Sequence, residues 1–279
     1  GFGERNIRRI EVDDQGRLDP GALRIAMAAA AGPTIVVCQA GHINSGAFDR
    51  FEEIADLVAE HDAWMHVDGA FGLWARTLPE LQGLCSGMDR ADSWSLDGHK
   101  WLQMPYDSGF AIVRHAAAHK RAMDITASYL TEDPRDGRNP TQFSPELSRR
   151  ARGFVVWAML QALGRDGVTE IVRRHCGCAR LIADRLSTVA GVWIENEVCL
   201  NQASLSFRRT ADDPAADRLT EEMARRLNAT GRFFLRTARW RGRTVLRISL
   251  TGNGNTAEVA VALAAAIEAE WSALRLREN

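Results

Sequence analysis

The first half of the chain alternates short apolar runs with stretches whose apolar residues recur at helical spacing. Phe51, Ile54 and Val58 recur in this way, and Asp49 stands where it would cap the start of that helix. Strands that alternate with helices predict βαβ units and a mostly parallel sheet covered by helices on both faces. The strands are expected at residues 34–38, 64–68, 93–96 and 110–113.

The second half has a different pattern. Residues 130–145 are polar and rich in Pro and Gly, which predicts a long loop. A smaller α+β unit is expected to follow, so we place a domain boundary near residue 165, between domains at 1–165 and 166–279. The first domain ends with a long helix over 148–163. The elements expected in the second are an apolar helical stripe over 168–186, strands at 204–207 and 245–250, and helices at 214–227 and 256–274.

Composition narrows the class of protein. The chain has 279 residues, 46% of them hydrophobic, and a net charge of −1, which gives no sign of a nucleic-acid or membrane partner. No apolar run reaches the roughly 18 residues of a membrane-spanning helix. The five cysteines are odd in number and include no CxxC pair, which argues against a disulfide framework and a zinc site. We therefore expect a reducing cytoplasm and no metal.

Lysine is rare in this chain. Of the 35 Lys and Arg residues only two are lysines, Lys100 and Lys120. Arginine can replace lysine in most surface roles, but its guanidinium does not form a Schiff base under physiological conditions. Each of the two lysines is therefore a candidate for amine chemistry, although genomic base composition could produce the same bias.

Two short runs carry most of the chemical signal. In the first, Asp68 directly follows an apolar strand and is followed by the small residues Gly69 and Ala70. In the second, a strand ends in a turn that carries His99 and Lys100. Taken alone, an Asp at a strand end is most often a cap or an ion-pair partner, and a His-Lys pair is most often a solvated surface. The combination is more specific, because Asp68 and Lys100 lie 32 residues apart at the ends of successive strands.

These runs resemble the group II pyridoxal-dependent amino-acid decarboxylases, which include aromatic amino-acid, histidine and glutamate decarboxylases. The order and spacing of the motifs agree from about residue 33 to 165, and the C-terminal third matches more loosely. The resembling runs are Gly46-Ala47-Phe48-Asp49, His66-Val67-Asp68-Gly69-Ala70, Ala91-Asp92-Ser93-Trp94, His99-Lys100-Trp101, Pro105-Tyr106-Asp107-Ser108-Gly109 and Ser148-Arg149-Arg150-Ala151-Arg152.

The resemblance implies a fold, a cofactor and a reaction. The fold is the α/β fold-type I of the aspartate aminotransferase superfamily, and the reaction is decarboxylation of an L-amino acid to its amine and CO2. Lys100 would carry pyridoxal 5'-phosphate (PLP) as an internal aldimine, and Asp68 would keep the pyridine nitrogen protonated. Ala70 would lie against the ring, and His99 beside the phosphate and the aldimine. The protonated ring is the electron sink for the carbanion left by CO2.

Tyr129 is a further candidate, at the edge of the predicted loop. The resemblance implies that a tyrosine at this place protonates the substrate carbon after decarboxylation, and that its loop reaches into the site of a neighbouring subunit. A homodimer follows from that arrangement. The alternative interpretation of Tyr129 is an aromatic residue that anchors the loop.

The sequence departs from the family pattern in three places. Residues 41–45 lack the Thr that family members often place near the cofactor. Asp97 stands where an Asn is common, and because a carboxylate facing the phosphate is unfavourable we expect a backbone contact or an outward side chain there. The segments that would cradle the phosphate and stack a His over the ring lie upstream of anything resembling Gly1. We therefore expect the C-terminal part of a longer enzyme, poorly stable and weak in cofactor affinity alone.

Two other functions stay open. One keeps the cofactor and changes the reaction, because related fold-type I enzymes run transamination or carbon–carbon cleavage. The other is a non-catalytic remnant or partner subunit. The upstream departures favour the remnant, while the presence of Asp68, His99, Lys100 and Tyr129 favours an enzyme.

Overall fold

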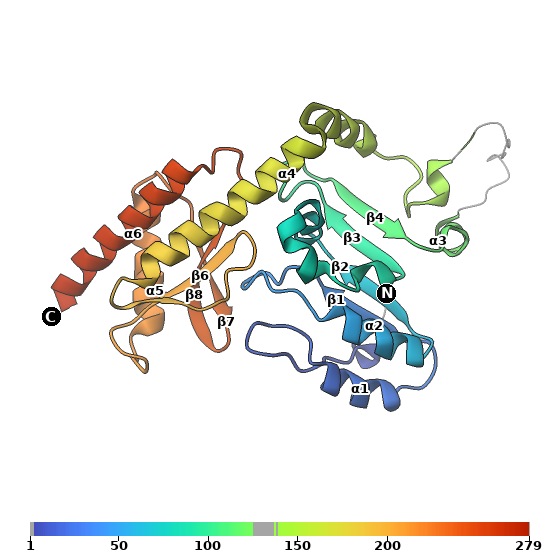
Figure 1. Ribbon diagram of the computed structural model, residues 1–279, viewed down its shortest axis with the longest axis horizontal. Coiled ribbons are helices and arrows are strands. Elements are labelled where there is room, and N and C mark those ends of the chain that lie inside the picture. Colours follow the sequence, from blue (N-terminus) through green and yellow to red (C-terminus); the bar gives the residue numbers. More distant parts are fainter. Residues whose placement is uncertain (1–2, 125–136, 138, 279) are drawn as a thin grey trace.

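The protein consists of two lobes connected by the long helix α4 (Arg152–Ser187), as Figure 1 shows. The structure is a computed structural model that describes residues 3–124, 137 and 139–278. The first lobe contains a sheet built on parallel strands, and the second contains an antiparallel sheet. Within the described part of the chain, no helix is both long and apolar enough to cross a membrane.

The first sheet has the strand order β1-β2-β3-β4. Its strands lie where the sequence predicts them, and they are β1 (Ile35–Gln39), β2 (Trp64–Asp68), β3 (Ser93–Asp97) and β4 (Gly109–Val113). The first three strands are parallel, because each connection between them crosses one face of the sheet. The loop between β3 and β4 lies at the carboxyl end of β3 and does not cross the sheet, so β4 runs antiparallel to β3.

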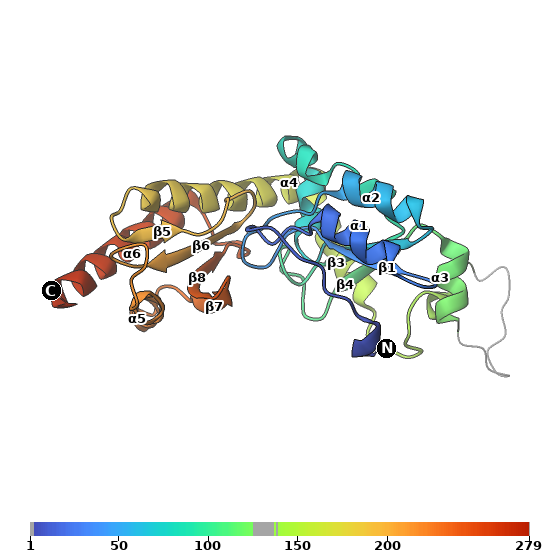
Figure 2. The ribbon, with the colours of Figure 1, turned by 90° about the horizontal axis from the view of Figure 1, so that it is seen from below.

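One face of this sheet packs against the helices α1 (Pro20–Ala28) and α2 (Phe51–Glu60), which Figure 2 shows on the same side. The apolar residues of α2 are buried there, as the helical spacing predicts. The predicted cap is wrong, however. Arg50 precedes the helix, and the Asp49 carboxylate instead accepts hydrogen bonds from the backbone of Leu18 at 2.8 Å and of Gln39 at 2.7 Å. Asp49 thus ties the N-terminal segment to β1, and burial raises its pKa.

The opposite face of the sheet is open to solvent in the described structure. Ile35 and Val37 of β1 keep 50% and 57% of their surface exposed. The same face carries the alternate residues of β2, which end at Asp68, and those of β3, which end at Asp97. Helices were expected on both faces, and the described residues of this chain supply them on one.

The loops that follow β1 and β2 touch each other. A side chain at Gly72 would place its Cβ 2.1 Å from the carbonyl oxygen of Ala40, so only glycine fits there. Short helical segments complete the lobe, namely η1 (Glu4–Asn6), η2 (Gly72–Thr77), η3 (Pro79–Cys85), η4 (Met88–Arg90), α3 (Ala116–Met123) and η6 (Pro140–Gln142).

Helix α4 joins what the sequence predicts as two helices. Only Gly164 departs from helical geometry inside it, at φ 60° and ψ −174°. The helix begins at Arg152 instead of residue 148, because Arg149 and Arg150 donate hydrogen bonds to the carbonyls of Glu146 and Asp107 in a bent segment. The domain boundary near residue 165 falls beside this kink and stays a prediction.

The second lobe contains an antiparallel sheet with the order β5-β6-β8-β7. Helices α4, α5 (Ala216–Ala229) and α6 (Ala257–Glu278) cover the face that buries Leu205, Phe207 and Leu246. The strands are β5 (Val192–Ile194), β6 (Gln202–Phe207), β7 (Arg236–Trp240) and β8 (Arg243–Ser249). The α+β unit is as predicted, but β5 and β7 were not expected from the sequence.

A buried histidine connects the two lobes beside the predicted active-site turn. The Nδ1 atom of His175 in α4 accepts a hydrogen bond from the indole N–H of Trp101 at 2.9 Å, since that indole can only donate. Its Nε2 then donates to the carbonyl of Gly252 at 2.9 Å. Burial lowers the pKa of His175 to about 4.

This histidine makes stability depend on pH. The unfolded chain takes up the His175 proton near pH 6.5, whereas the folded protein takes it up only near pH 4. Stability is therefore present above pH 6.5 and is lost as the pH falls towards 4, by roughly 3 kcal/mol at most. We expect the free energy of unfolding, measured with urea, to fall between pH 7 and 5. In the His175→Gln variant it should fall less over the same range. An equal pH effect in both proteins would contradict this role of His175.

Candidate active site

Asp68 and Lys100 come from the ends of the neighbouring strands β2 and β3. Asp68 is the last residue of β2 and is paired in register with Ser95 of β3. Lys100 lies in the turn that follows β3. The two loops are held together by the backbone N–H of Asp97, which donates to the carbonyl of Ala70 at 2.8 Å. The parallel pairing of β2 and β3 thus brings the predicted residues to one edge of the sheet.

The carboxylate of Asp68 is half-buried, and its hydrogen-bond donors among the described residues are neutral groups. Its Oδ1 accepts from the backbone N–H of Ala70 at 3.1 Å and from the hydroxyl of Ser95 at 3.4 Å. It forms no ion pair with any residue in the ranges that the structure describes. A half-buried carboxylate with only neutral donors is well suited to a cationic ligand group.

A row of polar side chains supports Asp68 on the open face of the sheet. The hydroxyl of Ser95 also lies 3.4 Å from Nε2 of His66, and the other ring nitrogen of His66 lies 2.8 Å from the hydroxyl of Ser93. Burial lowers the pKa of His66 and the charge of Asp68 opposes that shift, so the two side chains are electrostatically coupled. Neither serine was predicted as a site residue from the sequence, although their alternation before Asp97 is a period-two signal.

Lys100 forms an ion pair with Asp97. The distance from Nζ to Oδ2 of Asp97 is 2.8 Å, and 42% of the lysine side chain is exposed. The same oxygen lies 3.8 Å from Nε2 of His99. An outward side chain or a backbone contact was expected for Asp97, and the backbone contact to Ala70 is present. Its carboxylate, however, points to the lysine.

His99 is fixed by the loop that follows it. Its Nδ1 lies 2.8 Å from the carbonyl oxygen and 3.1 Å from the backbone nitrogen of Ser108. Its ring lies 4.2 Å from the ring of the exposed Tyr106, centre to centre. The imidazole is therefore held in place with Nε2 directed towards Asp97.

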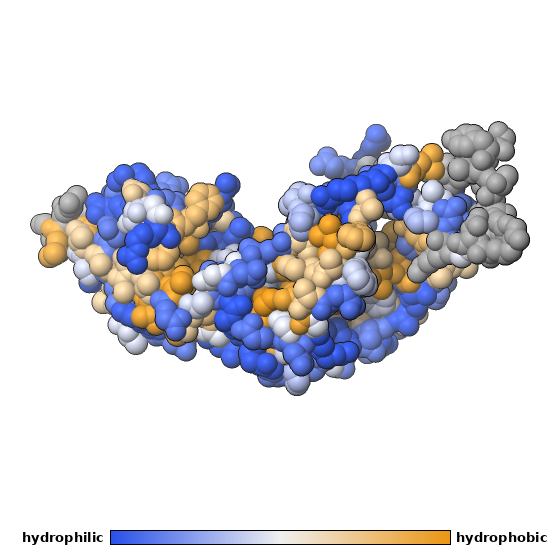
Figure 3. All heavy atoms as spheres, turned by 90° about the horizontal axis from the view of Figure 1, so that it is seen from above, coloured by the Kyte–Doolittle hydropathy of each residue, from blue (hydrophilic) through white to orange (hydrophobic). Residues whose placement is uncertain are grey.

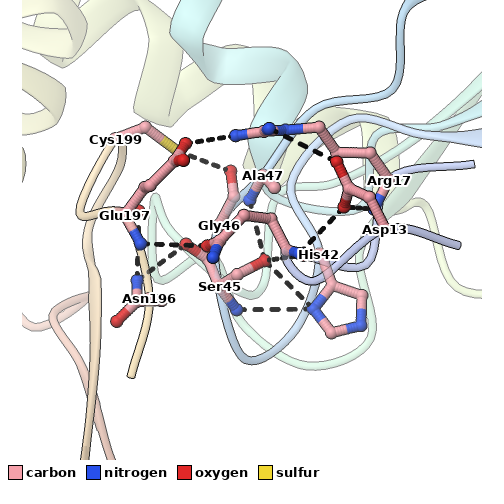
Figure 4. A network of polar contacts seen from close by, with 10 residues as sticks. Asp13, Arg17, His42, Ser45, Gly46, Ala47, Asn196, Glu197 and Cys199 are labelled. Carbon is pink, nitrogen blue, oxygen red and sulfur yellow. Dashed lines mark hydrogen bonds and ion pairs between the residues drawn. The ribbon is translucent and has the colours of Figure 1, made fainter. Parts of the chain in front are cut away.

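The loop after β1 is attached to the second lobe (Figure 4). The hydroxyl of Ser45 donates to the carbonyl of Gln15 at 2.6 Å, and the amide of Asn196 donates to the carbonyl of Ser45 at 2.8 Å. Arg17 and Glu197 form an ion pair at the same junction. Since this loop follows the strand beside β2, the junction fixes the second lobe next to the edge that carries Asp68.

The stretch 41–45, where the family pattern predicts a Thr, lies in this loop and includes His42 and Ile43. The Nδ1 atom of His42 lies 3.2 Å from the hydroxyl of Ser45, and burial lowers the pKa of the imidazole. Ile43 is exposed. His42 is thus engaged with its own loop. The segment with Tyr129 lies outside the described residues.

A separate pocket of about 340 Å³ lies in the second lobe, between the start of β7, the end of β8 and the start of α6. It is lined in part by Arg232, Arg236 and Arg247. Burial and the nearby Arg236 lower the pKa of Arg247. None of the predicted cofactor residues lines this pocket, so we place the chemistry at the strand ends.

The space-filling view shows a hollow between the two lobes (Figure 3).

The residues at the strand ends fit PLP by their chemistry. The cofactor needs an amine for its aldehyde, an acid for its pyridine nitrogen and small residues that admit a flat ring. Lys100, Asp68 and Ala70 would supply these groups. Gly69 must also stay small, because a Cβ there would lie 2.7 Å from the side chain of Leu73. Among the described residues, no group of three or more His, Cys, Asp or Glu is arranged to hold a metal.

Comparison with known proteins identifies the family. The pyridoxal-dependent decarboxylase conserved domain matches residues 2–208 of this chain. The chain belongs to this family. Its curated relatives include tryptophan decarboxylase 1 from Oryza sativa, 30% identical over 90% of this chain and 51% of the relative, and L-2,4-diaminobutyrate decarboxylase from Rhizobium meliloti, 29% identical over 93% of this chain and 53% of the relative.

Solved structures of the decarboxylase family agree with the fold. Oryza sativa TDC with PLP and tryptamine has a TM-score of 0.90 and 25% identity over 98% of this chain and 59% of that protein. Mouse CSAD, at 21% identity and a TM-score of 0.84, shows the fold alone, over 94% of this chain and 58% of that protein. The chain thus spans about half the length of the curated relatives it matches.

Proposed function

We propose that the protein decarboxylates an L-amino acid to its amine and CO2 with PLP attached to Lys100. The observation that carries this proposal is that the carboxylate of Asp68 and the amine of Lys100 come from the ends of neighbouring strands. The carboxylate of Asp68 has no cationic partner among the described residues, and the amine of Lys100 is connected to it through the contact between Ala70 and Asp97. Membership of the decarboxylase family supplies the reaction class.

Each residue has a defined task in this proposal. Lys100 provides the amine that holds the cofactor until a substrate amine displaces it. Asp68 keeps the pyridine nitrogen protonated, Ala70 leaves room for the ring, and the fixed Nε2 of His99 lies beside the reacting groups. When bound, PLP supplies an electron sink for the electron pair that CO2 leaves on the substrate.

Tyr129 is the proposed donor of the proton that replaces CO2 on the substrate carbon. The proposal includes a cytoplasmic homodimer in which the segment around Tyr129 approaches the neighbouring subunit's site. It rests on the resemblance to the family, because Tyr129 lies outside the described residues.

The test uses the longest form of the protein that its gene encodes, with added PLP and single L-amino acids. Aromatic amino acids, histidine and 2,4-diaminobutyrate come first, because relatives are named for them. We expect CO2 and the corresponding amine in equal amounts. Formation of keto acid without CO2 would contradict the proposal and indicate an aminotransferase. If neither product formed, the result would support a non-catalytic protein.

A further inference from the structure

The position of the Asp97 carboxylate is set by its backbone. The N–H of Asp97 donates to Ala70 at 2.8 Å, and its carbonyl accepts from the indole N–H of Trp74 at 3.3 Å. Asp97 is also the last residue of β3 and is paired with Gly109 of β4. A carboxylate anchored in this way is held in place, so Lys100 adapts to it.

The ion pair with Asp97 is the one that Lys100 forms among the described residues. The nearby Asp107 is engaged elsewhere, because its carboxylate binds Arg152 at 3.0 Å and lies 3.9 Å from Arg150. His99 is the other titratable group beside Asp97, at 3.8 Å. The amine therefore faces one anionic group, and that group is three residues away on the same turn.

We propose that Asp97 is a positioning residue that restrains the amine of Lys100 until the cofactor binds. The ion pair holds the side chain in one orientation. An ammonium group paired with a carboxylate has no lone pair for attack. This inference rests on the proposed function, because it concerns how Lys100 acquires the cofactor.

The restraint acts on a defined step. The ammonium group first releases its proton to water as the ion pair opens. The neutral nitrogen then adds to the aldehyde carbon of PLP, and one water molecule leaves as the carbon–nitrogen bond forms. An Asn at position 97, which is common in the family, would keep an oxygen facing Lys100 but carry no charge. Asp97 thus makes attachment slower and more dependent on pH than a neutral residue would.

The experiment compares attachment rates in protein from which the cofactor has been removed. PLP is added at pH 7, the product is reduced with borohydride after set times, and the Lys100 and Lys120 peptides are quantified by mass spectrometry. In Asp97→Asn, Lys100 is expected to be modified about twofold to fivefold faster than in the unchanged protein, the size of one partly exposed ion pair. The difference should shrink near pH 10, where lysine loses its proton without help.

Three controls separate charge from structure. Asp97→Glu keeps the charge and should stay slow, whereas Asp107→Asn removes a nearby charge that binds arginines and should behave like the unchanged protein. Lys120 should react equally in all variants and so reports on folding. Equal Lys100 rates in Asp97→Asn and the unchanged protein, or a difference that does not change with pH, would overturn the inference. Absence of any modification at Lys100 would instead refute the proposed function.

Discussion

Replacing Lys100 with arginine is expected to abolish decarboxylation, with a loss of about a thousandfold or more in kcat/KM. Arginine keeps the positive charge beside Asp97, so the turn should remain folded. It cannot form the covalent bond to the cofactor, and the visible absorbance of bound PLP should shift to that of the free aldehyde. Release of CO2 and the absorbance spectrum measure the two effects.

Lys120 provides the matched control, because it is the other lysine of the chain and lies in α3. Lys120→Arg should retain activity within about twofold, as a conservative replacement away from the site does. If the Lys100 variant kept a substantial part of the activity, another residue would hold the cofactor and the assignment would be wrong.

Asp68→Asn is expected to lower kcat by about a hundredfold to a thousandfold, or roughly 3–4 kcal/mol. The amide oxygen can still accept from the backbone of Ala70 and the hydroxyl of Ser95, so the strand end keeps its geometry. What the variant loses is the negative charge that keeps the pyridine nitrogen protonated. The loss should therefore appear in kcat more than in KM, which steady-state kinetics can separate.

An exposed acid gives the comparison for Asp68. Asp89 lies at the surface in η4, and Asp89→Asn changes the net charge by the same amount. It should leave kcat unchanged within error. A kcat for Asp68→Asn within about threefold of the unchanged protein would exclude Asp68 as the partner of the ring.

The sequence predicts well where side-chain pattern and packing agree. Strand β2 occupies residues 64–68 as expected, because its apolar residues alternate towards the covered face. Strand β7 was missed because its run Arg236–Trp240 is rich in arginine and lies at a sheet edge. Helix α4 looked like two helices because glycine interrupts the pattern, and the kink at Gly164 is the physical trace of that interruption.

In the candidate site, too, the sequence pattern predicts some features and leaves others undetermined. Asp68 and Lys100 could be placed at neighbouring strand ends because alternation of strands and helices fixes a parallel sheet. The contact between Lys100 and Asp97 depends on the shape of one turn, which composition does not determine. The junction of Gln15, Ser45 and Asn196 joins residues 30 and 151 positions apart, so no local pattern marks it.

Attachment of the cofactor to Lys100 can be measured directly. The longest form of the protein is purified with PLP, reduced with borohydride and digested, and the modified peptide is sequenced by mass spectrometry. Within this sequence, Lys100 and Lys120 are the two lysines that the modified peptide can identify. The account predicts pyridoxyl phosphate on Lys100 and none on Lys120. Modification of Lys120 alone, or of no lysine, would contradict it.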